Sequence, residues 1–501
     1  MGAFRKFFAT GRYLALRLSL LAIFLSSAGL LLLLSGDLIY SSFSHTLRPW
    51  HTHTIANEFK AKDASSQYTF QDYLAQEDKL FAEVDQLKAR AFNLELDSRL
   101  SRYSPAGSPL VSGFDRDWNR SFVMKAAPER AVALLVHGLS DSPYSMRATA
   151  LALVNDGVTV YGLRLPGHGS IPAGLDQVRY EDWSAAVSIA VRDIVTSHAG
   201  TPFFAVGYST GAALLLKYSA DAVLSGQLEK LPRILFLYSP ALGVTPLARF
   251  ANLQRLVTRF GVLQKARWSN VDLEIDPFKY QSFAKNAAAQ LSELLPTLYE
   301  ALAQIQKRGL SDKLPVIISF QSVVDQTIVA ADLLEKLYAI IDNPRSELVM
   351  FGLNRTSGLE TFLNFSPQAL LDVYKNLGSH NFRLSIVKNA SLDSLEVVER
   401  TTPADSDQFS ERDLHLAWPD DIFSLSHVAI PFPPDDPVNG YAALQDGKPR
   451  LNLGSLQLRG ERGVLMISAA DQLRLRSNPF YSYMIGKIVD TINADIAAKP
   501  H

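Results

Sequence analysis

The sequence has no cysteine among its 501 residues. The absence of thiols excludes disulfide bonds, a cysteine nucleophile and thiolate metal sites. There is no excess of one charge either, because 49 Lys and Arg residues balance 50 Asp and Glu residues, for a formal net charge of −1. The chain also lacks a basic run interleaved with aromatic residues on a recognisable nucleic-acid module. These absences exclude nucleic acid as a partner.

What remains is ordinary globular composition, with 47% hydrophobic and 20% charged residues. This composition excludes the disordered and fibrous classes. The length allows one large α/β domain with additions, or two domains.

The first 44 residues are predicted to be a cytoplasmic stub and a membrane anchor. Residues 18–35 carry no charge and can be extended to residue 40, which is close to the roughly 20 residues needed to cross a bilayer. A cleaved signal peptide is the alternative, but it needs a shorter apolar region, and residues 35–37 make a poor cleavage site. Four basic residues precede the run: Arg5, Lys6, Arg12 and Arg17. The positive-inside rule therefore predicts a single-pass protein with a cytoplasmic N-terminus and an extracytoplasmic catalytic domain, periplasmic in a bacterium.

Residues 45–115 are predicted to be a linker followed by an amphipathic helix. Residues 45–66 are polar and mixed, as in a linker, and Thr69 with Asp72 resembles a capping box that opens a helix to about Phe92. That helix either packs on the main domain or forms a stalk. The catalytic domain is expected over residues 116–501, with its first strand soon after Ser121.

The stretch from residue 203 to residue 218 is predicted to be a strand, a sharp turn at Ser209 and a helix. Gly207 and Gly211 flank the serine, and glycine is needed where the chain passes too close for a side chain. This is the pattern of a nucleophile elbow, in which backbone strain lifts the hydroxyl clear of the sheet. A chance Gly-x-Ser-x-Gly match is the alternative.

A second motif, His137-Gly138-Leu139, follows a buried strand at residues 131–136. Such a loop can offer a backbone N–H to a developing oxyanion. We predict that the Leu139 N–H acts together with the Thr210 N–H beyond the nucleophile. His137 is expected to brace the loop by hydrogen bonding and not to transfer protons.

Taken with Arg164-Leu165-Pro166-Gly167-His168-Gly169, these motifs resemble the α/β-hydrolase superfamily. Within it the chain is similar to the branch of monoacylglycerol lipases, lysophospholipases and serine aminopeptidase-like hydrolases. The resemblance covers about residues 131–351 and resumes around 426–427. It implies a mostly parallel sheet with helices on both faces and hydrolysis of carboxylic esters through an acyl-serine intermediate, with no cofactor. The alternation of strand and helix patterns agrees with this α/β fold class.

The superfamily carries a cap between two strands of its sheet, and the matching insertion here is about residues 241–313. Residues 247–260 repeat apolar residues at helical spacing. They belong to a stretch with basic residues and no acid, the basic residues being Arg249, Arg255, Arg259, Lys265 and Arg267. This pattern fits either a helix that leans on an anionic bilayer or a solvated cap helix. One or two further cap helices are expected through Ile305.

The acid and base of the triad are predicted to be Asp325 and His427. Asp325 follows a strand at residues 315–321, where the acid of a Ser-Asp-His order should fall, whereas Asp332 and Asp342 lie less favourably. His427 opens a proline-rich loop like the one that carries the base in the family. The other histidines after Asp325 are His380, His415 and His501, of which His415 is the second choice.

The sequence departs from the family between the acid and the base. A further insertion at about residues 353–420 holds a strand-like stretch at 382–387 and an acid-rich stretch near 404–413. Beyond the histidine, residues 464–467 are expected to form an edge strand and residues 478–496 a closing helix.

The resulting hypothesis is a membrane-anchored serine hydrolase that cleaves lipid-like esters of the monoacylglycerol or lysophospholipid type, without metal or cofactor. An aminopeptidase or amidase of the same fold is one alternative, for which Asp272, Glu274 and Asp276 could bind a substrate amine. A catalytically inactive, membrane-tethered binding module is another.

Overall fold

The computed structural model describes most of the chain from residue 46 onward. The described ranges are 46–91, 100–104, 114–243, 261–325, 330–355, 381–406, 408–441, 452–454 and 472–498, with single residues between 17 and 27. The predicted membrane span, the basic helix at 247–260 and the edge strand at 464–467 lie wholly or largely outside these ranges. None of the helices within them is both long enough and apolar enough to cross a bilayer.

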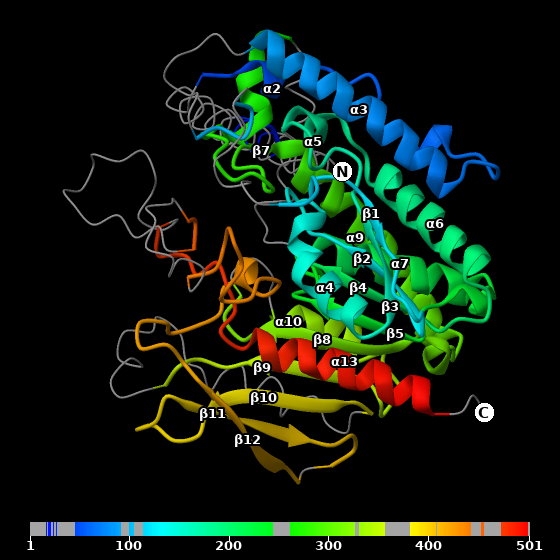
Figure 1. The fold of residues 1–501 in the computed structure, drawn as a ribbon, viewed down its shortest axis with the longest axis vertical. Helices are drawn as coiled ribbons and strands as arrows, with labels where there is room; N and C mark the ends of the chain where they lie inside the picture. The colour runs from blue at the N-terminus through cyan, green and yellow to red at the C-terminus, as the bar shows by residue number, and fades with distance from the viewer. Residues whose placement is uncertain are drawn as a thin grey trace, which may run out of the picture.

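The body is built on one ten-stranded sheet with the order β1-β3-β2-β4-β5-β8-β9-β10-β11-β12 (Figure 1). From β3 to β10 neighbouring strands are parallel, whereas β1 pairs antiparallel with β3 at one edge and β11 and β12 are antiparallel at the other. The strands are β1 (Phe122–Met124), β2 (Ala131–Val136), β3 (Val158–Leu163), β4 (Phe203–Tyr208), β5 (Ile234–Tyr238), β8 (Val316–Ser322), β9 (Glu347–Phe351), β10 (Arg383–Asn389), β11 (Glu396–Thr402) and β12 (Ser410–Ala417).

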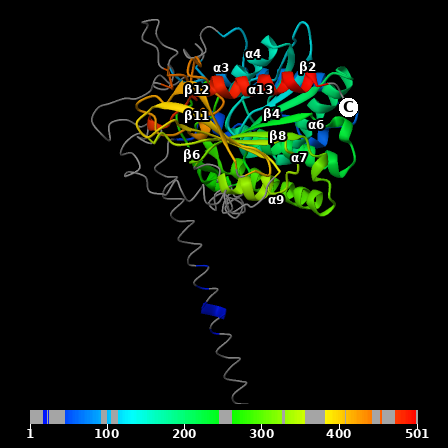
Figure 2. The ribbon, with the colours of Figure 1, turned by 90° about the horizontal axis from the view of Figure 1, so that it is seen from below.

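The central strands are apolar on both faces, as strands buried between two helical layers must be. In β2, Val132 and Leu134 face one hydrophobic cluster, whereas Ala133 and Leu135 face another. The first cluster contains side chains of α6 (Tyr180–Ser197), α7 (Thr210–Leu224) and α9 (Lys285–Lys307). The second contains side chains of α4 (Arg147–Asn155) and α13 (Tyr481–Ala497). Figure 2 shows α9 and α13 on opposite sides of the sheet.

Shorter elements connect these layers. They are α2 (Pro49–Thr52), α5 (Ala173–Gln177), α10 (Ala330–Leu333), the 3₁₀ helices at Ala61–Asp63, Pro143–Met146, Leu228–Lys230, Gly261–Arg267, Ser311–Lys313 and His427–Ala429, a π-helical turn at Leu334–Tyr338, and the small hairpin of β6 (Trp268–Asn270) and β7 (Phe283–Ala284).

The helix predicted as the second part of the cap is in fact a crossover helix. Helix α9 links the parallel neighbours β5 and β8, and parallel neighbours need such a connection. Its buried Leu294, Leu298 and Leu302 belong to the same cluster as the inner residues of α7. The expectation of cap helices through Ile305 is therefore wrong, because an apolar helical face reveals burial but not the surface that buries it. Of the predicted cap, the structure also describes residues 268–284, which include the β6–β7 hairpin and contact Ser140 and Asp141.

The segment predicted as a polar linker is part of the folded body. Trp50, Ile55 and Phe59 are buried, and α3 (Phe70–Ala91) packs on the domain as a helix rather than standing off as a stalk. The Thr69 and Asp72 capping box is confirmed, with bonds of 2.8 Å from the Thr69 N–H to the Asp72 carboxylate and 3.1 Å from the Asp72 N–H to the Thr69 hydroxyl.

A buried ion cluster fastens this N-terminal segment. The Arg164 guanidinium donates two hydrogen bonds to Glu58, at 2.9 and 3.1 Å, and one to Glu77 at 2.8 Å. Glu58 also accepts the Gly167 N–H at 2.8 Å. Carboxylates from the N-terminal segment therefore hold the loop that follows β3.

The insertion between acid and base extends the sheet. The strand predicted at 382–387 is confirmed as β10, and β11 and β12 continue the sheet beyond it. The acid-rich stretch near 404–413 ends inside β12, a strand that the sequence analysis did not predict. The predicted closing helix is confirmed as α13.

Candidate active site

Ser209 lies at the junction of β4 and α7, as predicted for an elbow. Its φ of 52° and ψ of −112° are unusual for a residue other than glycine, and such angles persist only where the surroundings impose them. The Ser209 N–H donates to the Tyr238 carbonyl at 2.9 Å, and its own carbonyl accepts the Ala241 N–H at 3.1 Å. The side chain is 7% exposed. Strand β5 and the chain after it thus fix the strained residue.

The flanking glycines are required by close approach, as predicted. A Cβ at Gly211 would lie 2.2 Å from the Val136 carbonyl oxygen, and one at Gly207 would lie 2.5 Å from the Ala212 Cα. No side chain fits at either distance, so β2, β4 and α7 can meet around Ser209 only with glycine at both positions.

The predicted acid and base meet. His427 Nδ1 lies 2.8 Å from Asp325 Oδ2, and both residues are buried, at 6% and 8% exposed. Because a carboxylate only accepts hydrogen bonds, Nδ1 carries the proton and Nε2 keeps a lone pair. The His427 ring centroid lies 5.3 Å from that of Tyr208, the residue before Ser209. Among the described residues, the Ser209 hydroxyl makes no hydrogen bond to His427.

Two polar residues at the end of β8 support this pair, and the sequence analysis gave neither a role. Gln321 donates from Nε2 to Asp325 Oδ2 at 3.0 Å, and Ser322 donates to the Leu425 carbonyl at 2.8 Å, which ties β8 to the histidine loop. A polar pair at the end of a mostly apolar strand was the available signal. Its partners were not visible, because the loop at residue 425 is far away in the sequence.

The loop of residues 138–142, which we call the oxyanion loop after its predicted role, lies against Ser209. A Cβ at Gly138 would be 3.2 Å from the Ser209 Cβ. His137 accepts the Leu165 N–H at Nε2, at 3.0 Å, and its Nδ1 lies 2.8 Å from the Gly138 carbonyl oxygen. In a trans peptide the C=O and N–H point in opposite directions. Holding the Gly138 carbonyl therefore also fixes the direction of the Leu139 N–H.

His137 is placed to brace this loop, as expected, and not to act as a base. Burial, with the neighbouring His168 as the next cause, lowers the pKa of His137 well below its ordinary value. The ring is neutral, and both of its nitrogens are engaged. Thr210, the other predicted donor, is the first residue of α7 and is fully buried. Its N–H belongs to the helix N-terminus, where N–H groups have no partner within the helix.

The alternative residues lie elsewhere. The His415 side chain is 87% exposed and pairs with Asp413 at 3.2 Å, on β12. Asp332 pairs with Lys336 at 3.0 Å, and Asp342 accepts a hydrogen bond from Asn381 at 2.6 Å. His380 and His501 lie outside the described residues. In the part of the chain that the structure describes, no group of three or more His, Asp and Glu side chains could hold a metal ion.

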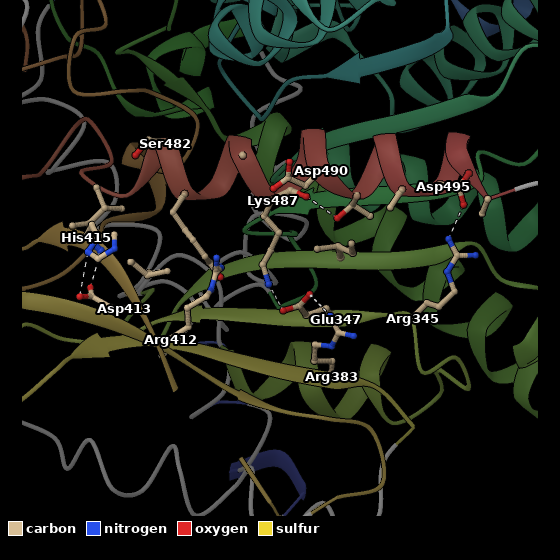
Figure 3. Close-up of a pocket in the computed structure, with 18 residues that line it drawn as sticks. Arg345, Glu347, Arg383, Arg412, Asp413, His415, Ser482, Lys487, Asp490 and Asp495 are labelled. Carbon is tan, nitrogen blue, oxygen red and sulfur yellow. Dashed lines mark hydrogen bonds and ion pairs between the residues drawn. The ribbon is translucent and has the colours of Figure 1, made fainter. Parts of the chain in front are cut away.

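A cavity of about 790 Å³ lies between α13 and strands β9 to β12, and Ser209, Asp325 and His427 do not line it (Figure 3). Charged groups on its walls are paired. Lys487 binds Glu347, which also lines the cavity, and Lys487 and Arg412 both bind Glu399, which does not, Arg412 at 2.6 Å. This ion network joins the closing helix to the added strands.

Comparison with known proteins agrees with the fold and the motifs. The model of the alpha/beta hydrolase family matches residues 133–379. This match, with the fold and the motifs, supports membership of the alpha/beta hydrolase superfamily. Over 54 residues it is 43% identical to the thermostable monoacylglycerol lipase of Bacillus sp. (strain H-257), a match that covers 11% of this chain and 22% of that lipase. This match supports the branch predicted from the sequence, and it spans about a fifth of the length of that lipase.

Solved structures of this superfamily align over about half of the chain. The monoacylglycerol lipase of Paleococcus ferrophilus is 16% identical, with a TM-score of 0.35, over 46% of this chain and 88% of that chain. A soluble variant of the monoglyceride lipase from Saccharomyces cerevisiae is 14% identical, with a TM-score of 0.33, over 50% and 90%. Both TM-scores are below 0.5, so the superfamily assignment rests on the family model and the motifs.

Proposed function

We propose that this protein is a serine hydrolase that cleaves carboxylic esters through an acyl-serine intermediate. The observation that carries the proposal is the buried hydrogen bond of 2.8 Å between His427 Nδ1 and Asp325 Oδ2, taken together with the strained backbone of Ser209 at the end of β4. The pair supports a base with a defined tautomer, and the strained serine supports a nucleophile.

In the proposed reaction, His427 Nε2 takes the Ser209 proton as the serine oxygen attacks the ester carbonyl. The Leu139 and Thr210 N–H groups stabilise the oxyanion, and Asp325 stabilises the imidazolium. His427 then gives the proton to the departing alcohol. Water attacks the acyl-serine by the same steps in reverse, which releases the carboxylic acid and restores Ser209.

We further propose a lipid-like ester as the substrate, of the monoacylglycerol or lysophospholipid type. The match to a monoacylglycerol lipase supports this class. The uncharged run at residues 18–35 supports a place at a membrane, with the N-terminus cytoplasmic and the catalytic domain outside. No metal or cofactor takes part in the proposed mechanism.

The alternative of an aminopeptidase or amidase needs an amine site, for which Asp272, Glu274 and Asp276 were predicted. Glu274 accepts the Ser282 N–H at 2.8 Å and Asp276 accepts the Phe278 N–H at 2.9 Å, and both carboxylates are buried. Glu274 and Asp276 therefore shape their own loop, and Asp272 alone of the three predicted acids is exposed. The proposal of an ester substrate rests on the match to a monoacylglycerol lipase.

The test compares wild type with Ser209→Ala on nitrophenyl esters, a monoacylglycerol and a peptide nitroanilide. We expect esters to be turned over faster than the amide, and turnover to fall by about 10⁴- to 10⁶-fold in the variant. Ser219→Ala, a buried hydroxyl on the same helix, is the matched control and should keep its activity. Ester turnover that survives in Ser209→Ala would contradict the mechanism, and faster cleavage of the amide would contradict the substrate class.

A further inference from the structure

The oxyanion loop is held by two consecutive residues of the segment 268–284. The Tyr280 N–H donates to the Ser140 carbonyl at 2.9 Å, and the Lys279 ammonium binds Asp141 Oδ2 at 2.9 Å. Consecutive residues of one segment therefore bind consecutive residues of the other. We call residues 276–280 the latch.

A third contact is made by Phe278, the latch residue before Lys279. The Phe278 ring stacks on Tyr144, with centroids 3.9 Å apart and planes 10° apart, and Phe114 meets both rings edge-on. Tyr144 is itself held by Asp436, at 2.9 and 3.0 Å. The 3₁₀ helix that directly follows the oxyanion loop is thus also fixed.

The loop needs such support because its backbone is strained. Ser140 has a φ of 62°, which is uncommon for a residue other than glycine, and it is buried. Ser140 follows Leu139, whose N–H is the proposed oxyanion donor. If residues 140 and 141 relaxed, the adjoining Leu139 peptide would turn with them.

The latch is also braced by hydrogen bonds of its own. The Asp276 carboxylate accepts the N–H groups of Phe278 and Lys279, at 2.9 and 3.0 Å. Glu274 closes the wider loop by accepting the Ser282 N–H. Lys279 is therefore presented by a preformed turn, which lowers the entropy lost when it pairs.

The ion pair is the contact on which the loop depends most. Asp141 is 4% exposed, and a buried carboxylate without a partner is strongly unfavourable. Burial raises the pKa of Asp141, and the Lys279 ammonium opposes that rise. Without Lys279, the Asp141 side chain would have to reach water or take up a proton, and either change alters the loop next to Leu139.

We propose that Lys279 is a positioning residue for the ester reaction, which acts through Asp141 to hold the Leu139 N–H toward the oxyanion. This inference rests on the proposed function. It predicts that loss of Lys279 lowers kcat much more than it raises KM, because the oxyanion develops only in the transition state.

The experiment uses the full chain and short nitrophenyl esters. We expect Lys279→Gln to lower kcat by roughly 10- to 100-fold with KM changed by less than about threefold, and Lys279→Arg to recover most of kcat. Lys388→Met is the control and should keep the wild-type kcat. Lys388 has a similar exposure and forms a 3.0 Å ion pair with Glu411, but it lies on β10, far along the sheet. Asp141→Asn provides a second way to break the pair should Lys279→Gln fold poorly.

The outcomes separate this inference from the proposed function. If wild type turns over no ester, the proposed function fails. If wild type is active but folded Lys279→Gln or Asp141→Asn keeps the wild-type kcat, the positioning role is overturned. A loss confined to KM, or a failure of Lys279→Arg to recover kcat although it is folded, would also overturn it.

Discussion

Asp325 is the residue whose contacts set the tautomer of His427. Its Oδ2 accepts hydrogen bonds from His427 Nδ1 at 2.8 Å and from Gln321 Nε2 at 3.0 Å. Two donors on one oxygen fix both the carboxylate and the ring. The position of Asp325 beyond a parallel strand was predictable from the sequence, whereas Gln321 has a role only because the chain turns back toward it after Ser322.

Asp325→Asn tests whether catalysis needs the negative charge of residue 325 or only its shape. The amide keeps the volume of the carboxylate but can donate to Nδ1, which favours the wrong tautomer of His427. We expect kcat for ester hydrolysis to fall about 10⁴-fold with KM little changed. Asp332→Asn, on α10, is the control. If kcat fell further in Asp332→Asn than in Asp325→Asn, the acid would have been misassigned.

At the scale of elements, the site depends on how closely β2, β4 and α7 approach. This part of the fold was predictable, because apolar strands, turn glycines and helical patterns are local signals. The place of α9 was not, since the pattern of a buried helix is the same whether it covers a sheet or an active site. The burial of Glu58 was equally hidden, because its partner Arg164 belongs to a loop distant in the sequence.

Two glycine-to-alanine changes in helices should have opposite effects. At Gly211 a Cβ would meet the Val136 carbonyl oxygen at 2.2 Å, so Gly211→Ala should lower the free energy of unfolding by about 3 kcal/mol. At Gly486, inside α13, no atom lies within 4 Å of the added carbon, and Gly486→Ala should raise it by about 0.5–1 kcal/mol. Urea unfolding of both variants measures this. Equal effects would mean that the packing around Ser209 is looser than described.

On the scale of the whole molecule, both added regions are fastened to the hydrolase core by buried ion networks. The N-terminal segment is held through Arg164, and α13 is held to β9 and β11 through Lys487, Glu347 and Glu399. The sequence shows these charges but not their pairing, because each network joins residues far apart in the chain. The hydrolase core and its additions therefore form one sheet-centred body (Figure 1).

The ion network of α13 should make the free energy of unfolding depend on pH in the acid range. Burial alone would raise the pKa of Glu399, but the Lys487 ammonium and hydrogen bonds from Lys487, Arg412 and Tyr483 lower it to about 2. A carboxylate whose pKa is lower in the folded state stabilises the fold above its unfolded pKa and loses that contribution as the pH falls toward 2.

Glu399→Gln should therefore be less stable than wild type by about 2 kcal/mol at pH 7. The difference should shrink as the pH falls from about 4.5 to about 2. Thermal unfolding at a series of pH values gives this difference directly. A gap that stays constant over this range would show that Glu399 is not held as a buried anion.

The central claim is that Ser209 is made nucleophilic by His427. Reaction with a fluorophosphonate probe, followed by peptide mass spectrometry, tests it most directly, because the probe bonds only to an activated serine. We predict an adduct on the peptide that contains Ser209, formed more than about 100-fold more slowly in His427→Ala. An adduct on another serine, or an undiminished rate in His427→Ala, would contradict the account.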